Sequence, residues 1–158
     1  MGTFILVHVL LSLMGIFSGF VVLFGMLAAK RLNGWTAAFL VTTVATSVTG
    51  FFLPAPHFMP SHAIGILSLI VLALAIFARY GRHLAGAWCR TYVISAVLAL
   101  YFNVFVLIAQ TFQKVPALKA IAPTQSEPPF AIAQLVVLVL FVVFGVAAAI
   151  KFRNGPGK

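Results

Sequence analysis

The chain has almost no acidic side chains. Among its 158 residues there is no aspartate, and Glu127 is the single glutamate. Paired carboxylates for general acid–base catalysis are therefore impossible, and a Ser-His-Asp triad cannot be assembled. Phosphate-binding motifs of the Walker A or GxGxxG type are also missing from the sequence. Any catalysis by this chain would have to rest on a bound cofactor.

Cysteine is nearly absent as well. Cys89 is the only one in the sequence, which excludes an internal disulfide, a CxxC redox pair and a CxxCH haem attachment. Because the sequence offers it no catalytic partner, we interpret Cys89 as a small residue at a helix contact. Sulfur therefore provides no covalent attachment for a cofactor.

Charge is scarce, and long apolar runs take its place. Charged residues make up 7% of the chain and hydrophobic residues 63%, and the mean hydropathy is +1.19. So few charged side chains cannot cover the surface of a soluble domain of this length. We therefore predict an all-α integral membrane protein in which residues 1–158 form a single transmembrane domain.

Apolar segments near the roughly 20 residues that a helix needs to cross the hydrocarbon core recur along the chain. We predict a bundle of five transmembrane helices, over residues 4–28, 35–53, 62–80, 92–112 and 130–150. The second segment is the least apolar, because hydroxyl residues between Thr42 and Thr49 dilute its hydropathy. A helix can satisfy such hydroxyls by bonding them to its own carbonyl groups, so we retain it as a span.

The distribution of lysine and arginine predicts the orientation of the bundle. One side carries eight of the ten basic residues: Lys30, Arg31, Arg79, Arg82, Arg90, Lys151, Arg153 and Lys158. The other side carries only Lys114 and Lys119. The positive-inside rule then predicts an external N-terminus and a cytoplasmic C-terminus. The net charge of +9 is thus interpreted as a topology signal and a contact with anionic lipids, and no nucleic-acid partner is expected.

This topology brings the most polar side chains of the spans to the external membrane boundary. They are His8, His57, His62, Gln110 and Gln134. Strongly polar groups in spanning segments are functional candidates, because burying them in lipid is costly. For each histidine taken alone, an interfacial anchor or an interhelical hydrogen bond is the simpler interpretation.

Three kinds of bound group suit this cluster. Imidazoles from two helices would ligate a haem b, whereas His8, His57 and His62 together would hold a copper or zinc ion. A quinone headgroup needs a few hydrogen-bonding groups in an apolar slot. The predicted cofactor-binding residues are His8, His62, Gln110 and Gln134. The sequence leaves the choice among haem, metal, quinone and no cofactor open.

Small residues suggest where helices meet. His8, Ser12, Gly15 and Gly19 recur at helical spacing on one face of the first predicted span, and Gly15 with Gly19 forms a small-xxx-small pattern. We expect this face to turn inward and to serve close helix packing, including contacts in a homo-oligomer or with other membrane subunits.

A small permease or channel is the alternative function. It would use hydroxyl and amide side chains along a polar path, namely Thr42, Thr46, Thr49, Asn103 and Gln110.

Three segments carry a family resemblance: GWTAAFLVTTVATSVTGFF, PSHAIGI and FQKVPALKAIAPTQSEPPF. They resemble small inner-membrane proteins of proteobacteria that have no assigned activity, which implies a multi-pass protein of the bacterial inner (plasma) membrane. The layout is also similar to that of the membrane cytochrome b subunits of some respiratory reductases. The expected function is therefore that of a non-catalytic or cofactor-carrying subunit of a membrane redox assembly.

Overall fold

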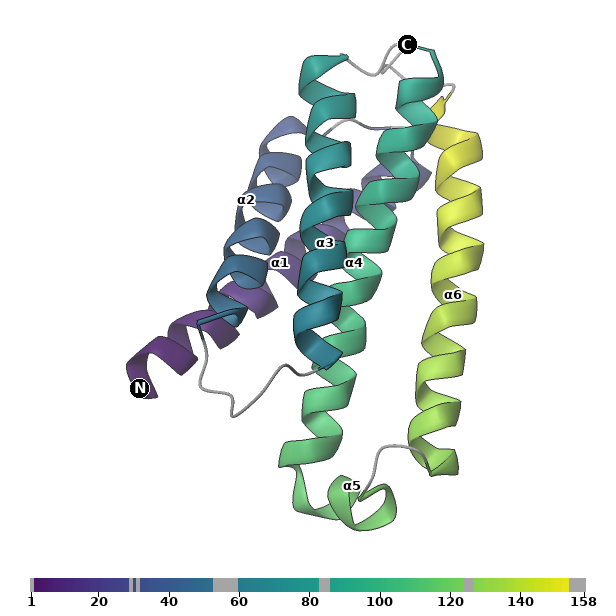
Figure 1. The fold of residues 1–158 in the computed structure, drawn as a ribbon. Helices are drawn as coiled ribbons and strands as arrows, with labels where there is room; N and C mark the ends of the chain where they lie inside the picture. Colours follow the sequence, from purple (N-terminus) through teal and green to yellow (C-terminus); the bar gives the residue numbers. More distant parts are fainter. Residues whose placement is uncertain are drawn as a thin grey trace.

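The computed structural model describes residues 2–28, 30, 32–52, 60–82, 86–123 and 127–153, and every regular element within these ranges is helical. Figure 1 shows long helices that run side by side and one short helix, α5, at one end. In chain order the elements are α1 (Gly2–Leu27), α2 (Asn33–Gly50), α3 (Pro60–Ile76), the π-helical η1 (Phe77–Gly81), α4 (Ala87–Lys114), α5 (Pro116–Ile121) and α6 (Pro128–Arg153). The all-α prediction is confirmed.

Four helices in the described ranges are long and apolar enough to cross a membrane. They cover Gly2–Leu27, Ala63–Gly81, Ala87–Ala109 and Pro128–Phe152, and they match the first, third, fourth and fifth predicted segments. This finding supports a multi-pass membrane protein. The helix α2 forms where the second segment was predicted, but its hydroxyl-rich 18 residues are not among these candidate spans.

The face of α1 that carries Gly15 and Gly19 packs against other helices of the same chain. A Cβ added at Gly19 would lie 2.6 Å from Leu100 Cδ1 of α4 and 3.0 Å from Phe39 Cε1 of α2. Gly15 faces Thr43 of α2 in the same way. These contacts pair α1 with α2 as an antiparallel hairpin. The expectation that this face turns inward is confirmed, and its contacts are with helices of the same chain.

The helix α4 is the centre of the bundle and α6 lies at its edge. In the apolar stretch of α4 44% of the residues are buried, against 6% in that of α6. The apolar core gathers around the first half of α4, with Tyr92, Val93 and Leu100 almost fully enclosed. The outward face of α6 consists of exposed valine, leucine and isoleucine side chains, as expected of a helix in contact with lipid.

The short π-helix η1 carries an arginine into the bundle. Arg79 is only 4% exposed, and its guanidinium carbon lies 5.2 Å from the centre of the Tyr92 ring of α4. Such a cation–π contact stabilises a charge that is shielded from water. Nearby, the Cys89 thiol is buried and lies 3.8 Å from the Phe152 carbonyl oxygen of α6. Cys89 therefore lies at the contact between α4 and α6.

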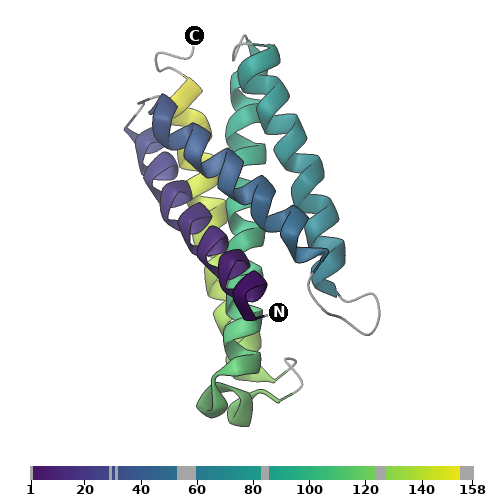
Figure 2. The same ribbon diagram turned by 90° about the vertical axis from the view of Figure 1, so that its left-hand side faces the viewer.

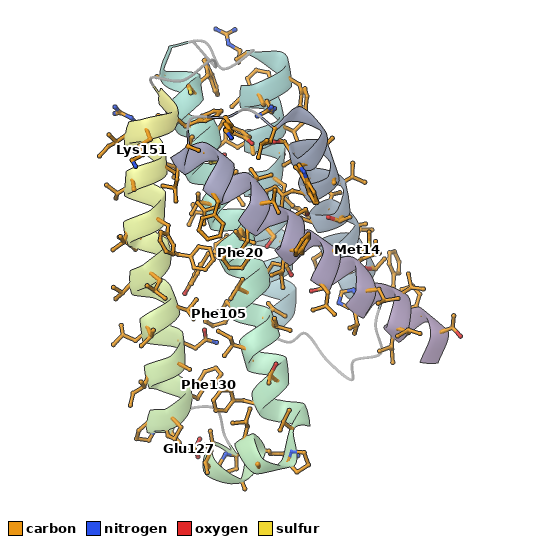
Figure 3. The ribbon with its side chains drawn as sticks, turned by 180° about the vertical axis from the view of Figure 1, so that it is seen from behind. Met14, Phe20, Phe105, Glu127, Phe130 and Lys151 are labelled. Atoms are coloured by element: carbon orange, nitrogen blue, oxygen red, sulfur yellow. The ribbon has the colours of Figure 1, made fainter. Side chains whose placement is uncertain are left out.

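The two ends of the bundle differ in charge. The turn between α1 and α2, the element η1 and the end of α6 lie at one end, and α5 lies at the other (Figure 1). In Figure 3, Lys151 and Glu127 mark these opposite ends. The helices α1 and α2 are inclined to α3, α4 and α6 (Figures 1 and 2).

Candidate ligand site between α1, α2, α3 and α4

A cavity of about 120 Å³ lies between the first four long helices. Its walls are largely apolar, with Val9 and Leu13 from α1, Phe51 at the end of α2, Ile64 from α3, and Phe102, Val106 and Leu107 from α4. The polar lining residues are His8, Ser12, Thr43, Thr46, Ser47, Ser68 and Asn103. An apolar enclosure with a few polar groups is typical of a site for a small organic ligand.

Glycines shape the wall of this cavity where α2 meets its neighbours. A Cβ at Gly65 of α3 would lie 3.0 Å from Phe51 Cζ, and one at Gly50 would lie 3.4 Å from His8 Cε1. The missing side chains let Phe51 and His8 approach the helix backbones closely. The cavity is therefore bounded by two rings, one from α1 and one from the end of α2.

The hydroxyl groups of α2 are mostly satisfied by their own helix. Thr42 donates to the Ala38 carbonyl at 2.6 Å, Thr46 to the Thr42 carbonyl at 2.7 Å, and Thr49 to the Ala45 carbonyl at 2.7 Å. This is the back-bonding that allows threonine to sit in an apolar helix. Thr46 also lines the cavity.

His8 is held by the last turn of α2. Its Nδ1 lies 2.8 Å from Thr49 Oγ1, and the ring is 8% exposed. With the Thr49 hydroxyl donating to the Ala45 carbonyl, its oxygen is available to accept from His8 Nδ1, an arrangement that favours a neutral ring protonated on Nδ1.

The inner end of the cavity contains an amide from α4. Ser12 Oγ of α1 donates to Asn103 Oδ1 at 3.2 Å, which orients the Asn103 amide with its nitrogen toward Gly15. Asn103 Nδ2 and Thr43 Oγ1 are buried atoms without a hydrogen-bond partner among the described residues. The polar centre of the site is thus formed by Ser12, Thr43 and Asn103.

The predicted site residues separate in the structure. His8 lines the cavity, whereas Gln134 lies between α6 and α4, where its Nε2 donates to the Phe105 carbonyl at 3.3 Å. Gln134 is not among the residues that line the cavity. His57 lies outside the described residues, and the side chains of His62 and Gln110 are likewise outside them, although both backbones are helical.

The predicted metal set cannot be assembled from the described residues. Within these ranges no group of three histidine, cysteine, aspartate or glutamate side chains is close enough to hold a metal ion. His57 and His62, two of the three predicted ligands, fall outside this comparison. The metal set of His8, His57 and His62 therefore stays a prediction.

The prediction from sequence missed Thr43 as a site residue. A signal was present, since Thr43, Ser47 and Gly50 recur at helical spacing and share the face of α2 that lines the cavity. No family model, curated protein or solved structure matches the chain. The interpretation of the site therefore rests on its own geometry.

Proposed function

We propose that this protein is a multi-pass inner-membrane protein that binds a lipophilic ligand with a ring-sized headgroup, such as a quinone, and serves as a subunit of a membrane redox assembly. The observation that carries the proposal is the cavity between α1, α2, α3 and α4. It combines apolar walls with a small number of fixed polar groups, which is the composition that a quinone headgroup requires.

The size of the cavity favours a single ring. Apolar cavities of about 150 Å³ in proteins accommodate one benzene molecule, and the cavity here is about 120 Å³. A haem, with four pyrrole rings, is too large for it. The cavity is therefore close to the size of a single ring, which is nearer to a quinone headgroup than to a haem.

The position of the cavity favours entry from the membrane. Two of its lining residues are also exposed on the outside of the bundle, Leu13 of α1 at 46% and Leu107 of α4 at 36%. In a bilayer this surface faces lipid, so a ligand with an apolar tail would enter sideways and leave the tail among the acyl chains.

A permease or channel has less support. The Thr42, Thr46 and Thr49 hydroxyls are bonded within α2. Beyond Asn103 the bundle is filled by Phe39 and Leu100, each 1% exposed. Proteoliposome flux of small ions and neutral solutes is expected to equal that of empty vesicles. Flux above that level would favour the transport function.

The proposed topology has five spans, with an external N-terminus and a cytoplasmic C-terminus. The gathering of the α1–α2 turn, η1 and the end of α6 at one end of the bundle supports it (Figure 1), because these elements flank most of the basic residues. A reporter fused after Lys158 is expected to read cytoplasm. A periplasmic reading would reverse the bundle and place the cavity in the opposite leaflet.

The ligand itself provides the main test. The protein is purified in mild detergent, and its lipid extract is analysed by chromatography and mass spectrometry, with a Soret absorbance scan and metal analysis of the same sample. We expect bound quinone above the level in an unrelated membrane protein from the same membranes. Quinone at the level of that control would remove the proposed function.

A pair of matched variants tests whether the quinone binds in the cavity. Val106→Phe places a ring into the cavity wall, whereas Val136→Phe adds the same ring to the outward face of α6, where Val136 is 51% exposed. We expect Val106→Phe to lower the amount of bound quinone severalfold and Val136→Phe to leave it unchanged. Equal quinone contents in the two variants would place the ligand elsewhere.

A further inference from the structure

Two hydrogen-bond donors meet at the inner end of the cavity. Thr43 is 2% exposed and Asn103 is 8% exposed, and both side chains line the cavity. Thr43 Oγ1 and Asn103 Nδ2 have no partner among the described residues. Buried donors are nearly always paired, since an unpaired one has lost its water without a replacement. Their presence together therefore indicates a partner from outside the chain.

The two donors converge on Gly15 of α1. A Cβ at Gly15 would lie 3.0 Å from Thr43 Oγ1 and 3.2 Å from Asn103 Nδ2. Any other residue at this position would fill the space beside both donors. Because Gly15 has no side chain, α1 does not crowd either donor atom.

The chemistry of the two groups selects the atom that they bind. Because Asn103 Oδ1 already accepts from Ser12, the amide presents its nitrogen, which can only donate. The Thr43 hydroxyl has no partner among the described residues, whereas Thr42 and Thr46 bond to their own helix. A carbonyl oxygen has two lone pairs and accepts from two donors at once.

We propose that Thr43, Asn103 and Gly15 form a binding site for a carbonyl oxygen on a ring-shaped ligand. This inference rests on the proposed function, because the same cavity receives the ring. Both donor atoms are covered in this structure. The Thr43 hydroxyl reaches the ligand by a turn about χ1, a torsion with more than one accessible minimum, and the Asn103 amide by a small shift that keeps its Oδ1 bonded to Ser12.

The test uses two ligands that differ at one atom. Acetophenone carries a carbonyl oxygen, and α-methylstyrene has a CH₂ group in its place. Dissociation constants are measured by ligand-observed NMR on the full chain in lipid nanodiscs, with empty nanodiscs as the blank. Partition into the bilayer is the same for every variant, so it cancels when a variant is compared with the wild type.

The decisive variant is Thr43→Val, which keeps the shape of the side chain and removes its donor. We expect it to bind acetophenone roughly two- to tenfold more weakly, as the loss of one hydrogen bond predicts, and to bind α-methylstyrene as the wild type does. The matched control is Thr42→Val, which removes a hydroxyl already bonded to Ala38 and is expected to change neither constant.

Gly15→Ala tests the space beside the donors. Its methyl group would come within 3.2 Å of both donor atoms, whereas a Cβ at Gly34 of α2 would meet nothing within 4 Å. We therefore expect Gly15→Ala to weaken acetophenone binding severalfold and Gly34→Ala to leave it unchanged.

Each outcome decides between the two proposals. If Thr43→Val alters neither constant, or both equally, the carbonyl site is wrong while the ring-sized cavity stands, and the donors are satisfied by water. If neither ligand binds the wild type, both proposals fall. Should Thr43→Val not fold, the wild type still decides, because the carbonyl site requires it to prefer acetophenone after correction for partition.

Discussion

Gly19→Ala is expected to destabilise the bundle, and the size of the effect follows from the contacts of α1. The new methyl carbon would lie 2.6 Å from Leu100 Cδ1 and 3.0 Å from Phe39 Cε1, up to about 1 Å inside the ordinary carbon–carbon contact distance. Leu100 and Phe39 are each 1% exposed, so neither can move aside without displacing its own neighbours.

The cost combines two opposing effects. Overpacking of a filled core costs about 1–3 kcal/mol, and replacing glycine by alanine within a helix returns up to about 1 kcal/mol. With overpacking at the middle of its range, about 2 kcal/mol, the net loss is about 1–2 kcal/mol, which corresponds to a fall of roughly 2–8 °C in the apparent melting temperature for a chain of this size. Gly145→Ala in α6 is the control, because its Cβ would meet Val97 Cγ1 at an ordinary 3.4 Å.

The assay is loss of the monodisperse protein peak in detergent after heating, compared at one heating rate because membrane proteins commonly unfold irreversibly. A double mutant sharpens it. Leu100→Ala alone should cost about 2–5 kcal/mol through the cavity that it leaves. In that background Gly19→Ala should cost less than in the wild type, because only the contact with Phe39 remains. If Gly19→Ala melts at or above the wild type, or if the two changes add, the packing of α1 against α4 is incorrect.

Three further outcomes follow from single contacts. Gln134→Leu should change the free energy of unfolding by less than about 1 kcal/mol. It removes a 3.3 Å hydrogen bond to Phe105, but also a buried Oε1 that has no partner among the described residues. A large loss of melting temperature would assign Gln134 another role. The neutral ring of His8 should carry its proton on Nδ1, as its contact with Thr49 favours, and ¹⁵N NMR of labelled histidine would contradict this by showing the other tautomer. Cys89, which is 3% exposed, should react with a maleimide only after denaturation, and rapid labelling of the folded protein would show that the contact between α4 and α6 is open.

Hydropathy and helical spacing predicted much of this fold. The apolar runs located the long helices, and the recurrence of His8, Ser12, Gly15 and Gly19 identified the face of α1 that turns inward. Both signals are local in sequence, since length and periodicity are properties of one segment. They need no knowledge of the neighbouring helices.

The residues that line the site could not be predicted from one segment at a time, because they come from several helices whose packing the local sequence does not specify. The predicted topology places Gln134 and His8 near the same end of the bundle. It gives the depth of a residue in the membrane but not which neighbouring helix its side chain faces. In the structure Gln134 bonds to Phe105 of α4, away from the cavity. The threonines of α2 look alike in sequence. Thr43 differs because its hydroxyl faces Gly15 and Asn103, which belong to two other helices.

The burial of Arg79 depends on the order of synthesis, because Tyr92, whose ring covers the Arg79 guanidinium, comes later in the chain. In the proposed orientation, α3 enters the bilayer before α4 has been synthesised in full. During that interval the guanidinium lacks the Tyr92 ring and stays among water and lipid headgroups, where it helps to hold the end of α3 on the cytoplasmic side. When α4 packs, the same charge is withdrawn into the bundle. A substitution at Arg79 would therefore act twice, first on the direction of insertion and later on the packing of the finished protein.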